Sequence, residues 1–344
     1  MPTSRAWFVD RYGGPERLVL RQRPDPVPGA GEVLVRTAAI GLNFADLFVR
    51  SGDYPRTPEP PFVPGMEISG TIEAADPAAA GLAPGQCVVA LPIFGGHAEK
   101  VAVPAARVFP LPEGADLVEA AAVAVTFLTA WYACHRAQVA AGERVVVTAA
   151  AGGVGTALLQ LLRERRAAVL ALVGSEDKLA LCRELGAADA GIYTSAEELV
   201  GRAFGGRPDV VIDAVGGRLF SRLWKRLEPG GRYVLYGFAA AAGGRGVAKA
   251  RAARELLAMG LHTPYGVIQS CRTLIGFNLS LLPGRSGELR RGAEEVFALW
   301  KDGRIHPVLG PRFPFEKLPD AHRALASRKT TGKVIVTAGA GLSG

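Results

Sequence analysis

The amino-acid sequence predicts an α/β protein of two domains, one rich in β-structure and one built on a doubly wound parallel sheet. The chain has 344 residues, 49% of them hydrophobic, and this length exceeds the usual size of one domain. Up to about residue 120, short apolar runs alternate with turns rich in proline and glycine. From Arg144 onwards, strand-like and helix-like segments alternate regularly. The first pattern is typical of β-structure, and the second is typical of parallel βαβ units.

The first 120 residues contain strand-like segments bounded by turn residues. The clearest are EVLVRTAAIGLN (32–43) and QCVVALPIF (86–94). Both are rich in β-branched residues and lie between glycines and prolines, which favour tight turns. We therefore expect a β-rich domain in this part of the chain.

The second part reads as strand, then helix, several times over. The expected strands are ERVVVTAA, AAVLALVG, DVVIDAVG and GRYVLYGF, and the expected helices between them are VGTALLQLLRER, EDKLALCRELG and RLFSRLWKRL. This order predicts a parallel sheet with helices on its faces. After about Gly243 a basic, helical stretch (KARAARELLAMG) leads to a strand over TLIGFNLSLL. A helix around Glu294–Lys301 and a last strand at GKVIVTA complete the chain.

Composition and charge exclude several classes of protein. The N-terminus, MPTSRAWFVD, lacks the apolar core of a signal peptide, and the longest apolar run, Ala120–Cys134, is too short to span a bilayer. We therefore expect a cytoplasmic protein without a membrane span. The four cysteines lie far apart, which favours reduced thiols. The net charge of +8 comes mostly from scattered arginines, a distribution that predicts no nucleic-acid surface but suits an anionic cofactor.

A glycine-rich loop lies between the first strand and the first helix of the alternating part. Compared with the dinucleotide fingerprint G-x-G-x-x-G, the chain has Ala150, Gly152 and Gly155, with Gly153 as an additional glycine. A diphosphate approaches bare backbone N–H groups at such a helix N-terminus. The motif alone does not exclude a plain tight turn, but the strands that follow it favour a dinucleotide site at Gly152, Gly153, Val154 and Gly155.

The end of the next strand indicates which dinucleotide binds. Sheets that prefer NAD usually have a carboxylate at this point for the ribose 2′-hydroxyl. Here the strand ends in Gly174-Ser175, which leaves room for a 2′-phosphate, and Lys178 follows with a charge to pair with it. We therefore expect NADPH. The alternatives are that Lys178 is a solvent-exposed helix lysine, and that Glu176 or Asp177 faces the ribose.

Several motifs together carry a family resemblance. The segments are GLNFADLFVRSGDYP (41–55), PGMEISG (64–70), AAAGGVG (149–155), KLALCRELGA (178–187) and TTGKVIV (330–336). In this order they resemble the zinc-free quinone oxidoreductase branch of the medium-chain dehydrogenase/reductase superfamily. GFNLSLL and FPFEKLPDA further resemble the vesicle amine transport protein homologues within it. The resemblance covers nearly the whole chain. It implies a GroES-like β-barrel catalytic domain at 1–122 and 283–344, with a Rossmann domain inserted at 123–282.

The same resemblance bears on zinc. The zinc alcohol dehydrogenases of this superfamily have a catalytic cysteine at the position of Asn43, a histidine at the position of Met66, and a four-cysteine lobe that this sequence lacks. Zinc requires nitrogen or sulfur ligands in tight geometry, which asparagine and methionine do not supply. His97 and His135 are isolated in the sequence, and we expect them to be ordinary polar residues. We predict no metal site.

Without a Lewis acid, hydride delivery to a quinone or an α,β-unsaturated carbonyl is easier than alcohol oxidation, because the negative charge develops on a conjugated oxygen. Asn43 is the first candidate for a polar group facing the nicotinamide or that oxygen. Its alternative role is to cap the helix that begins at FADLF. The resemblance implies a tyrosine at the position of Phe48, so this departure removes a proton donor and makes the pocket more apolar. Solvent or Tyr54 remains as the proton source.

Further cofactor contacts are implied by the resemblance alone. They are Thr126 and Thr129 near the nicotinamide ribose, Tyr193 near the adenine or the 2′-phosphate, and Arg328 with Lys333 reaching a phosphate from the tail. Val215, Gly216, Gly237 and Phe238 are expected after strand ends, and Phe277, Asn278 and Leu279 on the last strand of the sheet. For each, the alternative is an ordinary core or surface residue; the two threonines, for example, suit helix packing.

The last strand also predicts a homodimer. TLIGFNLSLL is apolar on both sides and ends the sheet, and an exposed apolar edge is usually paired or covered. The resemblance implies pairing of about Thr273–Leu281 with its copy across a two-fold axis. The preceding stretch, Val247–Gln269, is expected to be a mobile flap or a partner surface.

Three functions remain open from the sequence. The first is a zinc-independent NADPH-dependent reductase of a quinone or an α,β-unsaturated carbonyl, acting on a small hydrophobic electrophile. The second is an enoyl-thioester reductase of acyl or polyketide metabolism, and the third is a non-catalytic NADPH-binding module. Turnover separates the third from the others, and dependence on an acyl carrier or coenzyme A separates the second from the first.

Overall fold

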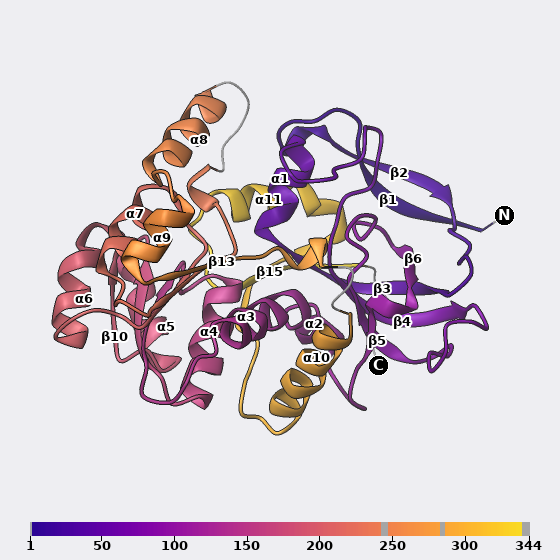
Figure 1. Ribbon diagram of the computed structural model, residues 1–344. Coiled ribbons are helices and arrows are strands. Elements are labelled where there is room, and N and C mark those ends of the chain that lie inside the picture. Colours follow the sequence, from indigo (N-terminus) through magenta and orange to yellow (C-terminus); the bar gives the residue numbers. More distant parts are fainter. Residues whose placement is uncertain (1, 242–246, 283–285, 339–344) are drawn as a thin grey trace. The chain divides into compact units, whose positions relative to one another are not determined.

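The computed structural model describes residues 2–241, 247–282 and 286–338. The chain divides into two compact units, Met1–Leu128 with Gly284–Gly344, and Thr129–Pro283. The domain limits expected from the sequence fall a few residues from this division. Figure 1 labels many of the elements of both units.

The first unit is rich in antiparallel β-structure, as its alternating apolar runs predict. β1 (Thr3–Val9) and β2 (Leu18–Pro24) form a two-stranded sheet. A seven-stranded sheet has the order β14-β15-β3-β4-β5-β7, with β6 paired to β3. The bounds are β3 (Glu32–Leu42), β4 (Ile68–Ala75), β5 (Cys87–Ala90), β6 (Lys100–Pro104), β7 (Val108–Pro110), β14 (Leu309–Pro314) and β15 (Lys333–Thr337).

The tail of the chain completes this sheet. β15 pairs antiparallel with β3, in a register that sets Val334 opposite Leu42 and Val336 opposite Ile40. These apolar side chains are buried in one core with residues of β4 and β5. The helices of the unit are α1 (Phe44–Ser51), α2 (Leu117–Ala120), α10 (Ser286–Lys301), α11 (Leu318–Ala326) and the beginning of α3 (Ala124–Arg136).

The second unit contains the predicted doubly wound sheet. Its six strands have the order β10-β9-β8-β11-β12-β13, and every pairing is parallel. The strands are β8 (Arg144–Thr148), β9 (Ala168–Val173), β10 (Asp189–Ile192), β11 (Val210–Asp213), β12 (Arg232–Leu235) and β13 (Thr273–Gly276). The strand order reverses between β8 and β11, which is where ligands bind in such sheets.

Helices connect the successive strands of this sheet. They are α4 (Gly153–Glu164), α5 (Leu179–Glu184), α6 (Ala196–Phe204), α7 (Gly217–Arg226), α8 (Val247–Ala258) and α9 (Pro264–Ser270). Leu199 of α6 and Phe220 and Leu223 of α7 pack in one core with Val146 and Tyr233 of the sheet. Within the described ranges, no helix is long and apolar enough to cross a membrane. All four cysteines are free thiols.

The expected last strand is shorter than its sequence pattern predicted. TLIGFNLSLL is extended only over Thr273–Gly276, and a 3-10 helix follows at Leu279–Leu281. The Asn278 side chain ends the strand, because its Oδ1 accepts the Ser280 N–H at 3.1 Å. Phe277, Asn278 and Leu279 therefore follow the strand and do not lie on it. Leu274 is 40% exposed on this edge strand.

Candidate functional site

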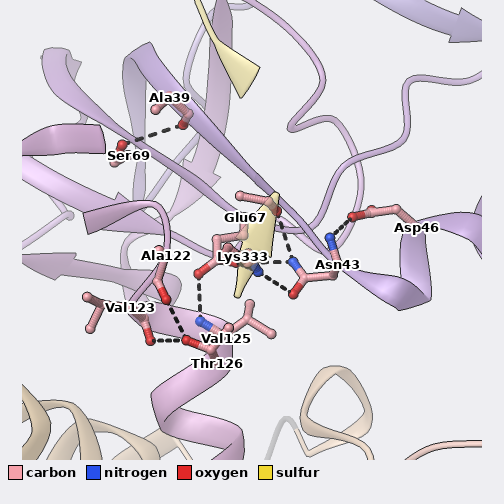
Figure 2. A network of polar contacts seen from close by, with 11 residues as sticks. Ala39, Asn43, Asp46, Glu67, Ser69, Ala122, Val123, Val125, Thr126 and Lys333 are labelled. Carbon is pink, nitrogen blue, oxygen red and sulfur yellow. Dashed lines mark hydrogen bonds and ion pairs between the residues drawn. The ribbon is translucent and has the colours of Figure 1, made fainter. Parts of the chain in front are cut away.

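Asn43 lies at the junction of β3 and α1, at the centre of a polar network within the first unit (Figure 2). Its Nδ2 donates to the Gly41 carbonyl at 3.0 Å and to Glu67 Oε2 at 3.1 Å, while its Oδ1 accepts from Lys333 Nζ at 2.6 Å. Lysine only donates and a carbonyl only accepts, so these partners determine the orientation of the amide. Both N–H donors of the Asn43 side chain are thereby used inside the protein.

Glu67 and Lys333 form a buried ion pair beside Asn43. Glu67 is fully buried, and its Oε2 accepts from Lys333 Nζ at 2.5 Å. Its Oε1 accepts the Val125 N–H, in the first turn of α3, at 2.6 Å. A carboxylate is favourable at a helix N-terminus, and a buried charge needs such partners to be tolerated. The network therefore connects β15, the start of α1 and the start of α3.

Asp46 extends the network to α1. Its Oδ2 accepts the Asn43 N–H at 2.8 Å, and Asn43 is the N-cap of α1, as its alternative role in the sequence predicts. Burial raises the pKa of Asp46 to about 7, against the opposing effects of that hydrogen bond and of Lys333. Asp46 Oδ1 has no hydrogen-bond partner among the described residues.

The network corrects two expectations. The Asn43 side chain has no N–H left to donate to an acceptor oxygen, and it offers only a lone pair of Oδ1. Lys333 was expected behind Arg328 as a phosphate contact, but its ammonium is buried against Asn43 and Glu67. Arg328 itself is exposed after α11.

Four further candidates make other contacts. They are Thr126 and Thr129 of α3, and Phe48 and Tyr54 near α1. Thr126 Oγ1 donates to the carbonyls of the preceding turn, and Thr126 and Thr129 are both buried, as the helix-packing alternative predicts. The Phe48 ring packs edge-on against Phe44 at a centroid distance of 6.0 Å. Tyr54 is half-buried against the core of the first unit.

His97 is not the isolated polar residue that the sequence suggested. It is fully buried, with its ring centroid 5.3 Å from that of His322, whose Nδ1 lies 2.9 Å from Arg50 Nη1. Burial, followed by the charge of Arg50, lowers the pKa of His97 to about 3. His135 stacks on Trp131 at 4.8 Å. Within the described part of the chain, no group of three histidine, cysteine or acidic side chains is arranged to hold a metal ion.

The second unit contains the glycine-rich loop in the predicted context. Gly152 is the N-cap of α4 and no side chain caps it, so the first N–H groups of the helix, from Gly153, Val154 and Gly155, have no acceptor within the helix. A Cβ at Gly155 would lie 2.3 Å from the Ala149 carbonyl, so the close approach of helix and strand requires glycine there. A Cβ at Gly152 would meet only that carbonyl, at 3.3 Å. This helix start fits the diphosphate of a dinucleotide.

Tyr193 contacts this loop, and Gly174 lies next to the Tyr193 ring. Tyr193 Oη accepts the Ala149 N–H at 3.1 Å, and a Cβ on Gly174 would lie 3.6 Å from the Tyr193 ring. Ser175 precedes the 3-10 helix Glu176–Lys178. Lys178 is only 8% exposed, so the alternative of a solvent-exposed lysine is wrong. Glu176 and Asp177 are exposed.

Sequence reasoning missed Asp213, which lies at the end of β11 where the strand order reverses. This buried carboxylate accepts from Thr148 Oγ1 at 2.6 Å, Tyr233 Oη at 2.8 Å, the Val215 N–H at 2.8 Å and the Gly216 N–H at 3.1 Å. Burial raises its pKa, against these hydrogen bonds. The available signal was a strand that ends in aspartate before Gly216-Gly217, where both glycines have positive φ (68° and 64°).

Asp213 thus holds the turn that carries Val215 and Gly216. The Ala240 N–H donates to the Val215 carbonyl at 2.9 Å, which links this turn to the segment of Gly237 and Phe238 after β12. The Phe277 ring lies 6.2 Å from the ring of Tyr236 and 4.8 Å from that of Tyr132. The expected contacts after β11 and β12 are therefore brought together at one edge of the sheet.

Comparisons with known proteins agree with this architecture. Residues 29–113 match the model described as an alcohol dehydrogenase GroES-like domain, and residues 185–336 match the model described as a zinc-binding dehydrogenase. The synaptic vesicle membrane protein VAT-1 homolog of Rattus norvegicus is 33% identical, over 98% of this chain and 85% of its own length.

Two solved structures extend the comparison. The quinone oxidoreductase of Thermus thermophilus, described together with its complex with NADPH, is 38% identical with a TM-score of 0.79, over 97% of this chain and 99% of that chain. The CurK enoyl reductase is 26% identical with a TM-score of 0.82, over 98% and 99% of the two chains.

Proposed function

Since this chain belongs to the quinone oxidoreductase-like branch of the medium-chain dehydrogenase/reductase superfamily, we propose that it transfers hydride from NADPH to a quinone or an α,β-unsaturated carbonyl without zinc. The observation that carries the proposal is the uncapped start of α4 at Gly152, beside Tyr193 and Gly174. A bare helix N-terminus at the carboxyl edge of a doubly wound sheet is suited to a dinucleotide diphosphate.

NADPH is preferred to NADH for two reasons. Gly174-Ser175 follow the end of β9 at Val173, without the carboxylate that would repel a 2′-phosphate, and the cation of Lys178 comes next on the same segment. The related Thermus protein was solved with NADPH. When bound, NADPH supplies the hydride. The residues proposed to hold it are Gly152, Gly153, Val154, Gly155, Gly174, Ser175, Lys178, Tyr193, Val215, Gly216, Gly237, Phe238, Phe277, Asn278, Leu279 and Arg328, with Asn43, Thr126 and Thr129 nearer the reacting end.

Independence of zinc is proposed from the donor set around Asn43. Met66 and Asn43 stand where the zinc dehydrogenases have histidine and cysteine, and neither side chain is a suitable zinc ligand. Asn43 Oδ1 is already bound by the Lys333 ammonium at 2.6 Å. A metal ion at this oxygen would have to displace that cation.

The contribution of the protein to the chemistry is mainly alignment. Because both N–H donors of the Asn43 side chain are used, the reduced oxygen of the acceptor takes its proton from solvent or from Tyr54. Quinones and enones suit such a site, since conjugation already delocalises the charge. Phe48, half-buried on α1, favours hydrophobic acceptors.

The proposal is tested by following NADPH oxidation with a bulky ortho-quinone and a simple enone in parallel, with NADH as the control. Turnover with NADPH and not NADH supports both the reaction and the proposed cofactor. Tight binding of NADPH without turnover of either acceptor contradicts the proposed reaction and leaves a thioester substrate or a binding module. Equal rates with NADH contradict the Lys178 site.

A second candidate function is reduction of enoyl thioesters. The similarity to the CurK enoyl reductase favours it, and so do the exposed Arg251 and Arg254 of α8, which suit a phosphorylated carrier arm. The same assay with crotonyl-coenzyme A separates the candidates. A rate that depends on the coenzyme A moiety supports the second candidate, and a rate limited to quinones and enones supports the first.

A homodimer through the edge of the second sheet is also proposed. β13 is the last strand in the order, and Leu274 on it is 40% exposed. Substitution of Leu274→Lys is expected to convert the dimer to a monomer in light scattering, whereas Val27→Lys, at an exposed site of the first unit, leaves it dimeric. A monomeric wild-type protein contradicts the proposal. The cytoplasmic location stays a prediction from the sequence.

A further inference from the structure

Lys333 belongs to the Asn43 network, and the proposed reaction assigns no role to the charge of Lys333. Its ammonium is buried, and its hydrogen bonds go to Asn43 Oδ1 at 2.6 Å and to Glu67 Oε2 at 2.5 Å. Figure 2 shows the three side chains converging between β15, α1 and the start of α3. Lysine carries a long, flexible side chain, so holding it in one buried geometry requires both partners.

The ammonium decides which end of the Asn43 amide faces it. With Lys333 present, Oδ1 must face Nζ, and Nδ2 then reaches the Gly41 carbonyl and Glu67. If Lys333 is removed, Oδ1 loses the cation that holds it in this orientation. Nδ2 keeps its two acceptors, and the amide loses one of the three contacts that fix its orientation.

The backbone is shaped to keep the network close. A Cβ at Gly41 would lie 2.0 Å from the Ala121 carbonyl and 2.7 Å from Glu67 Oε2. Only glycine lets β3 approach the segment before α3 so closely, and this approach brings Glu67 within reach of Asn43, Lys333 and the Val125 N–H at once.

We propose that Lys333 is a positioning residue of the hydride-transfer reaction: its ammonium, neutralised by Glu67, fixes the Asn43 carboxamide with Oδ1 as a hydrogen-bond acceptor. This inference rests on the proposed function. Asn43 then recognises a donor, such as a carboxamide N–H or a ribose hydroxyl, and does not recognise the oxygen of the acceptor. The competing explanation is that Lys333 only balances the charge of Glu67.

The experiment removes the charge pair as a unit. Lys333→Met alone leaves Glu67 buried and unpaired, and loss of folding would then obscure the result. The test variant is therefore Glu67→Gln with Lys333→Met, which keeps an acceptor for the Val125 N–H and removes both charges of the buried pair. The matched control is Lys100→Met, because Lys100 also binds two carboxylates in the first unit, Asp25 at 2.9 Å and Glu73 at 2.8 Å.

The expected result separates stability from catalysis. The paired variant should unfold at the wild-type temperature, while kcat with NADPH and a quinone falls about 10- to 100-fold, because a small misplacement of a positioning group has effects of this size. Lys100→Met should retain kcat. If the paired variant keeps both the stability and the kcat of the wild type, Lys333 is only a counter-ion and the proposal is overturned.

A mutant cycle shows whether Lys333 acts through Asn43. Adding Asn43→Ala to the paired variant should lower kcat no further than Asn43→Ala does alone, within about twofold. If the losses of kcat from Asn43→Ala and from the paired substitutions multiply instead, the two sites act independently and the proposal is overturned. The isotope effect with 4-deuterated NADPH should rise in the paired variant, because hydride transfer becomes slower relative to the other steps.

The orientation of Asn43 is measured without any cofactor. In protein labelled with ¹⁵N-asparagine, the Nδ2 hydrogens of Asn43, assigned by Asn43→Ala, should exchange slowly in the wild type and rapidly in the paired variant. Unchanged exchange would overturn the proposal. If the wild type shows this protection but does not oxidise NADPH, the proposed function has failed while the structural role of Lys333 stands.

Discussion

Thr148 and Asp213 join neighbouring strands at the point where the order of the second sheet reverses. Thr148 Oγ1 donates to Asp213 Oδ1 at 2.6 Å and accepts the Ala214 N–H at 3.0 Å. The ends of β8 and β11 are thereby held together under the turn that carries Val215 and Gly216. This buried contact is a structural support for the proposed cofactor site.

Replacing Asp213 by alanine is therefore expected to destabilise the protein. Four donors, two of them backbone N–H groups, lose their acceptor in a buried site. The free energy of unfolding should fall by about 3 kcal/mol or more in chemical denaturation. Asp302→Ala, at an exposed position, is the control and should change it little. Equal stability of the two variants would contradict the support role of Asp213.

The stability of the first unit should depend on pH through Asp46. Its pKa is raised by burial to about 7 in the folded protein, so the fold favours the protonated form. That contribution is complete below the unfolded pKa of about 4 and is lost as the pH rises through about 7. Asp46→Asn removes the dependence and keeps an oxygen acceptor for the Asn43 N–H. Relative to wild type, the variant should gain a few kcal/mol in unfolding free energy across this range, as measured in urea at several pH values. A constant difference at all pH values would contradict the raised pKa.

Two alanine substitutions in the glycine-rich loop should affect different properties. One should lower the stability of the fold, and the other should weaken NADPH binding. Gly155→Ala places a Cβ 2.3 Å from the Ala149 carbonyl and should lower the unfolding free energy by about 1 to 3 kcal/mol. Gly152→Ala meets that carbonyl only at 3.3 Å, so it should cost at most about 1 kcal/mol. Its methyl group should instead weaken NADPH binding, measured by cofactor fluorescence. Undiminished affinity in folded Gly152→Ala would contradict a diphosphate at this helix start.

The proposed 2′-phosphate contacts are tested by Lys178→Ala with Arg328→Ala. Loss of ion pairs to a phosphate should weaken NADPH binding by a few kcal/mol, on the order of 2 to 3. NADH, which lacks this phosphate, should bind the variant and the wild type alike. If NADPH affinity is unchanged, these residues do not contact the phosphate. Lys329→Ala, next to Arg328 and exposed, is the matched control.

Local sequence patterns predicted the sheet of the second unit because its strands are continuous apolar runs and its helices follow the 3.6-residue period. They did not identify β10 and α6, and they extended β13 past Asn278 to Leu282. The side chain of that asparagine bonds to the backbone two residues ahead and ends the strand. A periodic pattern does not contain this information.

The partners of Asn43 were beyond prediction for a different reason. Glu67 and Lys333 lie 24 and 290 residues away in the chain, and only the pairing of β15 with β3 brings Lys333 to the amide. The sequence placed Asn43 correctly at the start of α1. It did not identify Asp46, whose carboxylate accepts the Asn43 N–H at this helix start.

The pairing of β15 with β3 also has a consequence for the order of assembly. The sheet of the first unit cannot close until residues 333–337 have left the ribosome, whereas every strand of the second unit precedes residue 283. During synthesis the inserted unit is therefore able to fold first. Asn43 is made 290 residues before Lys333, so the polar network forms only after residue 333 has left the ribosome.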